Sequence, residues 1–278
     1  MTDGRDRLAS APRRDRPADG SARPPLAIAR PRVTPHAVHD RERLAQLLQR
    51  DPHLHAYSLG DLDDFFWPYT TWYERDEQVI LVYHGGGFPT VLAFDRDTAA
   101  LKDFIESTLF LLPQRFYAHI STGASPWPGG EAHLKMALTR PADTPALGEP
   151  LTRADLDELT ALYEAAYPGN WFDPRMLDTG QYMGVRRDGR LIAVAGVHVW
   201  SPVYRVCALG NVTTHPDFRG MGFGRAVVAA LCHRLHATVD HITLNVKADN
   251  HSAIAVYRSL GFTEVGHYDE MWVRLSGS

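Results

Sequence analysis

Three alternating glycines, followed at once by a helical pattern, restrict the fold of this chain more than any other feature. The segment LGNVTTHPDFRGMGFGRAVVAALCHRL, residues 209–235, runs from strand-forming residues through Gly220, Gly222 and Gly224 into a helix. Glycines leave room for an anion beside consecutive backbone N–H groups, and a helix start adds partial positive charge. The pattern predicts a strand, a phosphate cradle at residues 219–225 and a helix, although a tightly packed glycine turn would have the same sequence.

The glycine run differs from two widespread phosphate-binding loops. A dinucleotide fingerprint G-x-G-x-x-G requires glycine at position 225, where the chain has Arg225. A Walker loop requires G-K-[ST], which does not occur in the sequence. Neither type of nucleotide site is therefore predicted.

The composition excludes several classes of protein. The 278 residues are 44% hydrophobic with a net charge of −4, so the chain has no general attraction to nucleic acid or anionic lipid. Cys207 and Cys232 are too few for a disulfide framework and fit a reducing compartment. No apolar run reaches the length of a membrane span, and the N-terminus lacks the apolar region of a secretory signal. We expect a soluble cytoplasmic protein without nucleic-acid or membrane partners.

The first part of the chain predicts a tail followed by an α/β unit. Residues 1–30 are rich in Arg, Asp, Pro, Ser and Gly without an apolar period, which predicts a disordered tail. A helix is expected through DRERLAQLLQRD with Asp40 as its N-cap, and another over residues 98–112 with Asp97 as its cap. Strands are predicted for TTWYER, EQVILVYHG, FPTVLAFD, RFYAHIS and AHLKMALTR.

A Pro-rich polar segment at residues 141–150 predicts a linker to a second α/β unit. Thr152 is expected to cap the helix LTRADLDELTALYEAAY, and Asp188-Gly189 predicts a hairpin. The remaining predicted elements are the strand VCALGNVTT, the helix at residues 222–236, the strand HITLNV, the helix NHSAIAVYRSL and one or two strands in FTEVGHYDEMWVRL.

Two linked motifs give this second unit a family resemblance. Arg219, Gly222 and Gly224 match the [QR]-x-x-G-x-[GA] signature of the GCN5-related N-acetyltransferases (GNAT), which the chain resembles over about residues 150–275. The motifs occur in the family's order, separated by the expected helix and strand. The second motif, N-x-x-A-x-x-x-Y-x-x-x-G-F, is matched by Asn250, Ala253, Tyr257, Gly261 and Phe262.

The resemblance implies a fold and a domain plan. It implies the GNAT fold of the α/β (α+β) class, in which helices flank a mixed central β-sheet. The chain is similar to tandem members of the family. On this plan residues 31–140 form a smaller, degenerate GNAT-like domain without a glycine cradle, and residues 151–278 form the domain that binds acetyl-CoA.

The resemblance also implies an N-acetyltransferase that moves an acetyl group from acetyl-CoA to the primary amine of a small-molecule or amino-acid-like acceptor by direct attack. Backbone N–H groups of the cradle would hold the pyrophosphate, and the pantetheine arm would lie between the strands NVTT and TLNV. A backbone N–H near Val212 would polarise the thioester. The implied cofactor-binding residues are Val212, Thr213, Thr214, Arg219, Gly220, Met221, Gly222, Phe223, Gly224, Arg225, Asn245, Asn250 and Tyr257.

Tyr257 stands at the family's position for the general acid that protonates the leaving thiolate. A phenol is almost fully protonated at neutral pH, which suits this role. The alternative is that Tyr257 only packs on its helix face. Asn250 is expected to cap the same helix and, by the resemblance, to contact the cofactor as well.

The sequence does not identify the general base. Many relatives have a glutamate on the strand before the cradle, at the place of Gly210 or Asn211. Neither residue can accept a proton. A water relay is one alternative, and the candidate side chains are Glu164, His198, His215 and Glu270.

Other readings of the sequence also stay open. His233, His236 and His241 lack ligand-like spacing to a further Cys or carboxylate, so no metal site is predicted. The aromatic loop YPGNWFDP, residues 167–174, either selects a hydrophobic or amino-acid-like acceptor or only anchors itself.

The alternatives to a small-molecule acetyltransferase are an acyl-CoA sensor or pseudoenzyme and a protein or peptide N-acetyltransferase. The protein is expected to be a monomer or a homodimer.

Overall fold

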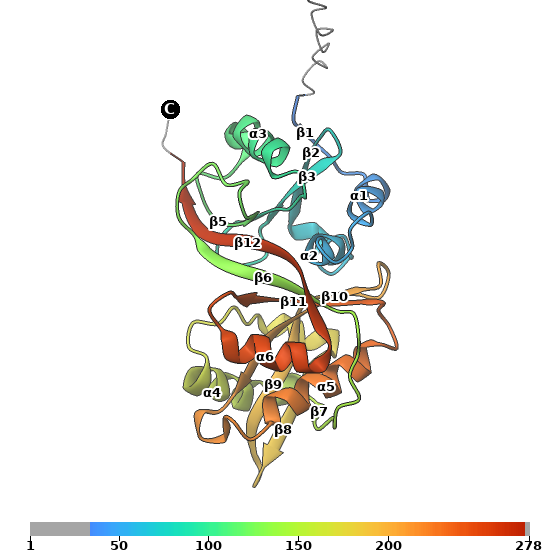
Figure 1. Ribbon diagram of the computed structural model, residues 1–278, viewed down its shortest axis with the longest axis vertical. Helices are drawn as coiled ribbons and strands as arrows, with labels where there is room; N and C mark the ends of the chain where they lie inside the picture. The colour runs from blue at the N-terminus through green and yellow to red at the C-terminus, as the bar shows by residue number, and fades with distance from the viewer. Residues whose placement is uncertain (1–33, 276–278) are drawn as a thin grey trace, which may run out of the picture. The chain divides into compact units, whose positions relative to one another are not determined.

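One sheet of twelve strands runs through residues 34–275, the part of the chain that the computed structural model describes (Figure 1). The strand order is β1-β2-β3-β4-β5-β12-β6-β11-β10-β9-β8-β7. Parallel and antiparallel pairs occur in the same sheet, and helices flank it, so the predicted mixed α/β architecture is confirmed. The tail predicted at residues 1–30 lies outside the described residues.

The first half contains the predicted elements and two short additional ones, β1 and α2. Elements of two and five residues carry too little periodicity to be recognised in the sequence. Two 3₁₀-helices, Trp67–Tyr69 and Leu109–Leu111, precede β2 and follow α3. The bounds are β1 His36–Ala37, α1 Arg41–Leu48, α2 Ala56–Gly60, β2 Thr70–Arg75, β3 Gln78–Tyr83, β4 Thr90–Ala93, α3 Thr98–Thr108, β5 Arg115–Ser121 and β6 Glu131–Leu138.

The second half follows the predicted order of elements. Its last strand is continuous, with a register shift between Glu264 and Gly266, where the sequence left one or two strands open. Three 3₁₀-helices, Arg153–Asp155, Pro174–Thr179 and Pro216–Phe218, complete the loops. The bounds are β7 Glu149–Pro150, α4 Leu156–Ala166, β8 Met183–Arg187, β9 Arg190–Ser201, β10 Val206–Thr214, α5 Phe223–Leu235, β11 His241–Lys247, α6 His251–Leu260 and β12 Phe262–Arg274.

Side-chain caps explain why several helices begin where the sequence predicts. The Asp40 side chain accepts a hydrogen bond from the N–H of Arg43 (2.9 Å), and that of Asn250 from Ala253 (3.1 Å). Asp97 caps α3 in the same way. Each cap satisfies one N–H that has no partner inside its helix. In the described part of the chain, no helix has both the length and the apolar character needed to cross a membrane.

The last strand connects the two halves of the chain. β12 lies between β5 and β6 and is antiparallel to both (Figure 1). On its other edge β6 pairs with β11 of the second half. The described residues 34–275 accordingly belong to one compact unit. The division at the linker into domains at residues 31–140 and 151–278 stays a prediction.

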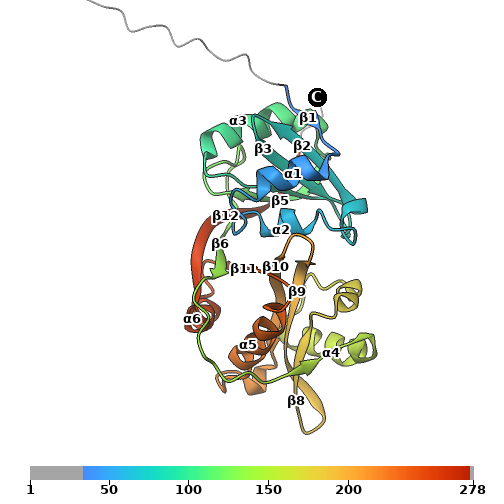
Figure 2. The same ribbon diagram turned by 90° about the vertical axis from the view of Figure 1, so that its right-hand side faces the viewer.

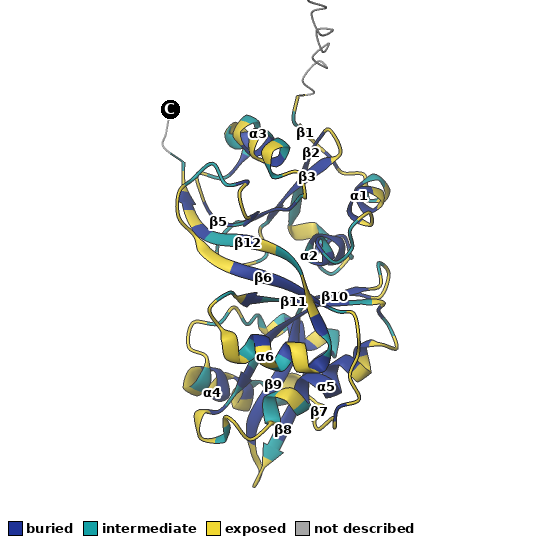
Figure 3. Ribbon diagram, in the orientation of Figure 1, coloured by how far each residue is buried: buried dark blue, intermediate teal, exposed yellow. Residues whose placement is uncertain are grey.

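Apolar side chains cover both faces of the sheet, and strands β3, β9 and β10 are buried over most of their length (Figure 3). In the second half α4 and α5 lie on opposite sides of β8 and β9 (Figure 2). In the first half one core cluster includes Leu44 of α1 and Leu59 of α2, and another includes Phe104 of α3. Strands covered on both faces read as continuous apolar runs, as LIAVAGV does in β9.

The close approach of α6 to the end of β6 gives a stability prediction. Gly261 ends α6 with φ 98°, its carbonyl accepts from the N–H groups of Thr139 and Arg140, and an added Cβ would overlap the Arg140 carbonyl. Gly261→Ala should therefore lower the free energy of unfolding by roughly 2–4 kcal/mol in chemical denaturation. Gly129 is the control, because at φ 84° its added Cβ meets nothing within 4 Å. Gly129→Ala should cost about 1 kcal/mol, and equal losses would contradict the predicted clash.

Candidate active site

Two neighbouring strands part at the centre of the sheet. β10 and β11 pair in parallel over residues 206–209, and the pairing ends at Leu209 and Leu244. Beyond this point β10 stays bonded to β9, and β11 to β6. The facing edges of residues 210–214 and 245–247, here called the strand gap, therefore do not pair with each other. An extended ligand can bind such edges as an added strand.

A buried hydrogen-bond network fixes the backbone where the strands part. The register of β10 against β9 shifts at residues 210–213, and Asn211 has φ 55°. The Tyr163 hydroxyl donates to the Asn211 carbonyl oxygen (3.0 Å), and Asn211 Nδ2 donates to the Tyr182 hydroxyl (3.1 Å). The Tyr182 hydroxyl donates in turn to the Val197 carbonyl (3.2 Å). The β-bulge is thus held by three hydrogen bonds, and bulges of this kind re-aim the groups they carry.

The glycine run forms an open turn at the start of α5. The first N–H of the helix with a carbonyl partner is that of Ala226, which donates to Gly222 (3.0 Å). Within the described structure the N–H groups of residues 220–225 donate to no protein acceptor. A Cβ added to Gly220 or Gly222 would meet nothing within 4 Å. The turn therefore offers free N–H groups and open space to an anion.

The motif arginine braces this turn. Arg219 Nε donates to the Thr214 carbonyl (3.2 Å), and its Nη2 donates to the Ala166 carbonyl (2.9 Å). These bonds tie the cradle to the ends of β10 and α4. Arg225, at the other end of the run, is exposed. The bracing role of Arg219 was not apparent from the sequence.

The other predicted cofactor residues lie along the strand gap and the cradle. Val212, Thr213 and Thr214 are on the gap edge of β10, and Asn245 is on that of β11. Met221 is exposed in the turn, whereas Phe223 begins α5 and packs partly into the core. Gly224 lies against Thr214, since an added Cβ would come within 3.0 Å of its Oγ1. Asn250 caps α6.

Tyr257 is buried on α6, with its ring 5.8 Å from that of Phe262. Burial raises the pKa of Tyr257, so its hydroxyl is protonated at neutral pH. Among the described residues none is hydrogen-bonded to this hydroxyl. A protonated phenol with an unused donor is suited to supply a proton.

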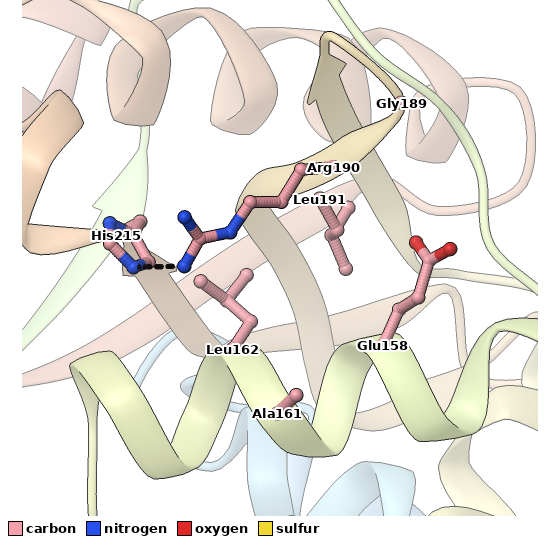
Figure 4. Close-up of a pocket in the computed structure, with 7 residues that line it drawn as sticks. All are labelled: Glu158, Ala161, Leu162, Gly189, Arg190, Leu191 and His215. Carbon is pink, nitrogen blue, oxygen red and sulfur yellow. Dashed lines mark hydrogen bonds between the residues drawn. The ribbon is translucent and has the colours of Figure 1, made fainter.

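Two of the four candidate bases have other surroundings. Glu164 is exposed on α4. His215 lines a cavity of about 270 Å³ between α4 and the β8–β9 hairpin, which none of the predicted cofactor residues lines (Figure 4). Its Nε2 lies 2.6 Å from Nη2 of Arg190. Because a guanidinium only donates, this nitrogen is already in use as an acceptor.

Glu270, the third candidate, is held in a polar cluster between β5, β12 and β6. Its carboxylate accepts from the hydroxyls of Tyr117 (2.8 Å) and Tyr268 (2.6 Å). Nε2 of His119 and of His133 lie 3.8 Å and 3.7 Å from it. Burial acts to raise the pKa of Glu270, but the histidines and hydroxyls outweigh it and lower that pKa. Glu270 is therefore ionised at neutral pH, and both of its carboxylate oxygens already accept hydrogen bonds from tyrosine hydroxyls.

Lys135, which the sequence analysis did not single out, belongs to the same region. Its Nζ lies 3.8 Å from the ring centroid of Phe94, 5.1 Å from that of Tyr57 and 5.2 Å from that of Tyr268. Burial lowers the pKa of Lys135 to about 7, against the opposing charge of Glu270. The only sequence signal was one lysine within the apolar strand AHLKMALTR.

His198, the fourth candidate, lies beside the strand gap. It is on β9 next to Gly210, the first residue of β10 after the last pair with β11. A Cβ added to Gly210 would overlap the His198 imidazole. The histidine ring therefore occupies the space that a side chain at position 210 would take.

The first half has neither a glycine cradle nor a strand gap in its described residues. β4 pairs with β5 along its whole length, and the N–H of Asp95 after it donates to Ser121 Oγ (3.1 Å). At the start of α3, the carboxylate of Asp97 accepts from the N–H of Ala100 (3.0 Å). Asp95 in turn accepts from the N–H of Asp97 (2.7 Å). Carboxylates therefore take the place that an anionic ligand would need.

Aromatic rings from both halves meet near the loop at residues 167–174. Trp171 is 50% exposed and stacks on Tyr117, with ring centroids 5.6 Å apart. Its ring also contacts that of Phe88 (4.5 Å), which in turn contacts Trp272 (4.4 Å). Phe172 packs against the core instead. Phe172 thus anchors the loop to the core, whereas Trp171 leaves part of its ring exposed.

The histidines considered as metal ligands in the sequence, His233, His236 and His241, do not come together in the described structure. His233 lies on α5, whereas His241 lies on β11 and its ring packs against that of His53. In residues 34–275 no three His, Cys, Asp or Glu side chains are placed to hold a metal ion.

Known proteins are similar in sequence to the second half of the chain. Residues 149–262 match the family model described as "Acetyltransferase (GNAT) family". The N-alpha-acetyltransferase RimI of Mycobacterium tuberculosis is 31% identical over 139 residues, which cover 46% of this chain and 84% of RimI. The mycothiol acetyltransferase of Paenarthrobacter aurescens is 34% identical over 40% of this chain. The chain spans only about a third of that relative's length, 32%.

The fold similarity extends over both halves. A solved tandem GNAT protein from the clavulanic acid biosynthesis pathway, crystallised without AcCoA, aligns with a TM-score of 0.50. The alignment covers 88% of this chain and 98% of that protein at 16% sequence identity. At this identity the likeness concerns the fold alone.

The network at the bulge gives a second stability prediction. Tyr182→Phe removes the acceptor of Asn211 Nδ2 and the donor to the Val197 carbonyl, so two buried groups lose their partner. The free energy of unfolding should fall by roughly 2–3 kcal/mol in chemical denaturation. Tyr73→Phe, which removes one hydrogen bond to the Leu111 carbonyl, should cost about 1 kcal/mol. A smaller loss for Tyr182→Phe than for Tyr73→Phe would show that the network does not hold the bulge.

Proposed function

The chain belongs to the GNAT acetyltransferase family, and from this premise we propose that it transfers an acetyl group from acetyl-CoA to the primary amine of a small-molecule or amino-acid-like acceptor. The observation that carries the proposal is the strand gap, which opens beside the glycine cradle and α6. An acyltransferase needs a place for each part of the donor: an anion site, a channel for an extended arm and a proton donor near the sulfur.

The donor would lie along the gap. The free N–H groups of residues 220–225 would hold the pyrophosphate, with Arg219 bracing the turn. The pantetheine arm would bond to the unpaired edges of residues 210–214 and 245–247 as an added strand. An N–H of the bulge near Val212 would then polarise the thioester carbonyl. Asn245 and Asn250 flank the same path.

The reaction would be a direct attack of the amine on the thioester carbon. Holding amine and thioester in line supplies much of the acceleration in such a transfer. Tyr257 would give its hydroxyl proton to the sulfur as the carbon–sulfur bond breaks. Its buried, protonated phenol supports this role more than a packing role alone, since packing does not require the hydroxyl.

The acceptor would enter from the loop at residues 167–174. The exposed face of Trp171 and the neighbouring rings favour an acceptor with a flat apolar part. Two relatives are named for different acceptors, one for N-alpha-acetylation and one for mycothiol. The match covering 84% of RimI makes a peptide α-amine the second candidate acceptor, to be included in an amine screen.

Calorimetric titration with acetyl-CoA tests the donor site. Wild-type protein should bind one acetyl-CoA per chain, because among residues 34–275 only the second half has the gap and the cradle. Gly222→Val should weaken binding at least about tenfold, since its side chain would fill the space beside the free N–H groups. Gly129→Val is the control for valine at a left-handed position and should bind normally. A folded wild-type protein that does not bind would end the proposal.

Tyr257→Phe separates an enzyme from an acyl-CoA sensor. With any amine that the wild type acetylates, kcat should fall about a hundredfold, because the thiolate would leave without its general acid. The dissociation constant for acetyl-CoA should stay within about twofold of the wild type. Steady-state kinetics and calorimetry on one preparation measure both. Wild-type binding without turnover on any amine would favour the sensor.

A further inference from the structure

One contact in the sheet bears on the missing general base. The strand before the cradle has Gly210, which offers no side chain that could accept a proton. Gly210 directly follows the last β10–β11 pair, so it stands at the entrance of the strand gap. Because Gly210 has no Cβ, the His198 imidazole can lie against its backbone. A ring from the neighbouring strand therefore occupies the volume of the absent side chain.

The strand register explains why His198 lies there. β9 pairs Val199 with Ala208 and Val197 with Leu209, and the register shifts between these two pairs. His198 is the extra residue of that irregularity. Extra residues of this kind leave the regular alternation of a strand and re-aim a side chain, often next to active sites. A regular strand would not direct this ring toward Gly210.

The position of His198 leaves its ring nitrogens free to accept a proton. His198 is half-buried, and neither ring nitrogen is hydrogen-bonded to any residue in the part of the chain that the structure describes. Burial lowers the pKa of His198 to about 4, so that the imidazole is neutral at neutral pH. The Glu270 carboxylate of β12 acts in the opposite direction and would stabilise an imidazolium once formed. Tyr57 of α2 packs 6.3 Å away, ring to ring.

We propose that His198 is the general base of the acetyl transfer, taking the proton that the acceptor amine loses. The inference rests on the proposed function. The amine nitrogen forms a bond to the thioester carbon, and one N–H proton passes to a ring nitrogen of His198. The carbon–sulfur bond breaks, and the sulfur takes the hydroxyl proton of Tyr257. His198 then releases its proton to water and Tyr257 regains one, leaving an amide and free CoA thiol.

The first test removes the imidazole. His198→Ala and His198→Gln should lower kcat about a hundredfold, while the acetyl-CoA dissociation constant stays within about twofold. Glutamine fills a volume similar to that of the ring but is not basic. The glutamine variant therefore still tests the proposal if the alanine variant fails to fold. His267→Gln is the control, because His267 is exposed elsewhere on β12. If either folded variant keeps more than about a third of wild-type kcat, the proposal is overturned.

The second test moves the base to the neighbouring strand. In the double variant His198→Ala/Gly210→Glu, the new glutamate side chain on β10 would extend into the space that the imidazole occupies in the wild type. This double variant should recover at least about tenfold in kcat over His198→Ala. Gly210→Glu alone should be impaired, because its side chain would overlap the retained ring. A folded double variant without recovery would assign His198 a packing role and overturn the proposal.

The two proposals fail in different ways. Wild-type protein that acetylates an amine but tolerates the loss of His198 leaves the acetyltransferase function intact and removes only the base assignment. Wild-type protein that acetylates no amine, although it binds acetyl-CoA, overturns both.

Discussion

The parting of β10 from β11 after Leu209 and Leu244 is the constraint on which the rest of this structure depends. Adjacent strands normally pair to their ends, because unpaired N–H and C=O groups lose hydrogen bonds that water replaces only where it has access. Here each strand is held on its outer edge instead, β10 by β9 and β11 by β6. The open inner edges of the strand gap follow from that arrangement, and the bulge lies where the two strands part.

The first half of the chain supports this arrangement without duplicating it. β6, a strand of the first half, supplies the outer partner of β11, so one wall of the strand gap depends on it. β12 then inserts between β5 and β6 and brings Glu270 beside His119 and His133. In the first half, β4 pairs with β5 along its whole length. The carboxylates of Asp95 and Asp97 accept hydrogen bonds from N–H groups at the start of α3. The contribution of the first half to the site is therefore structural and electrostatic.

The polar groups around Glu270 illustrate how burial sets charge states. The carboxylate is ionised because two hydroxyls donate to it and two histidines face it, and these together outweigh desolvation. Lys135 faces aromatic rings instead and has its pKa lowered by burial. In a medium of low dielectric constant such groups act on one another over longer distances than at the surface. The charge of Glu270 accordingly affects the pKa of His198.

Local interactions are what the sequence by itself determined. The caps at Asp40, Asp97 and Asn250 bond to N–H groups three residues away, and the glycine turn needs only its own backbone. Helix starts, the cradle and the family motifs were for this reason predictable. Tertiary structure decided what depends on strand partners distant in sequence: the insertion of β12, the cluster at Glu270 and the register shift that directs His198 to Gly210. A strand's partner and register follow from packing across the whole sheet, and no short stretch of sequence encodes them.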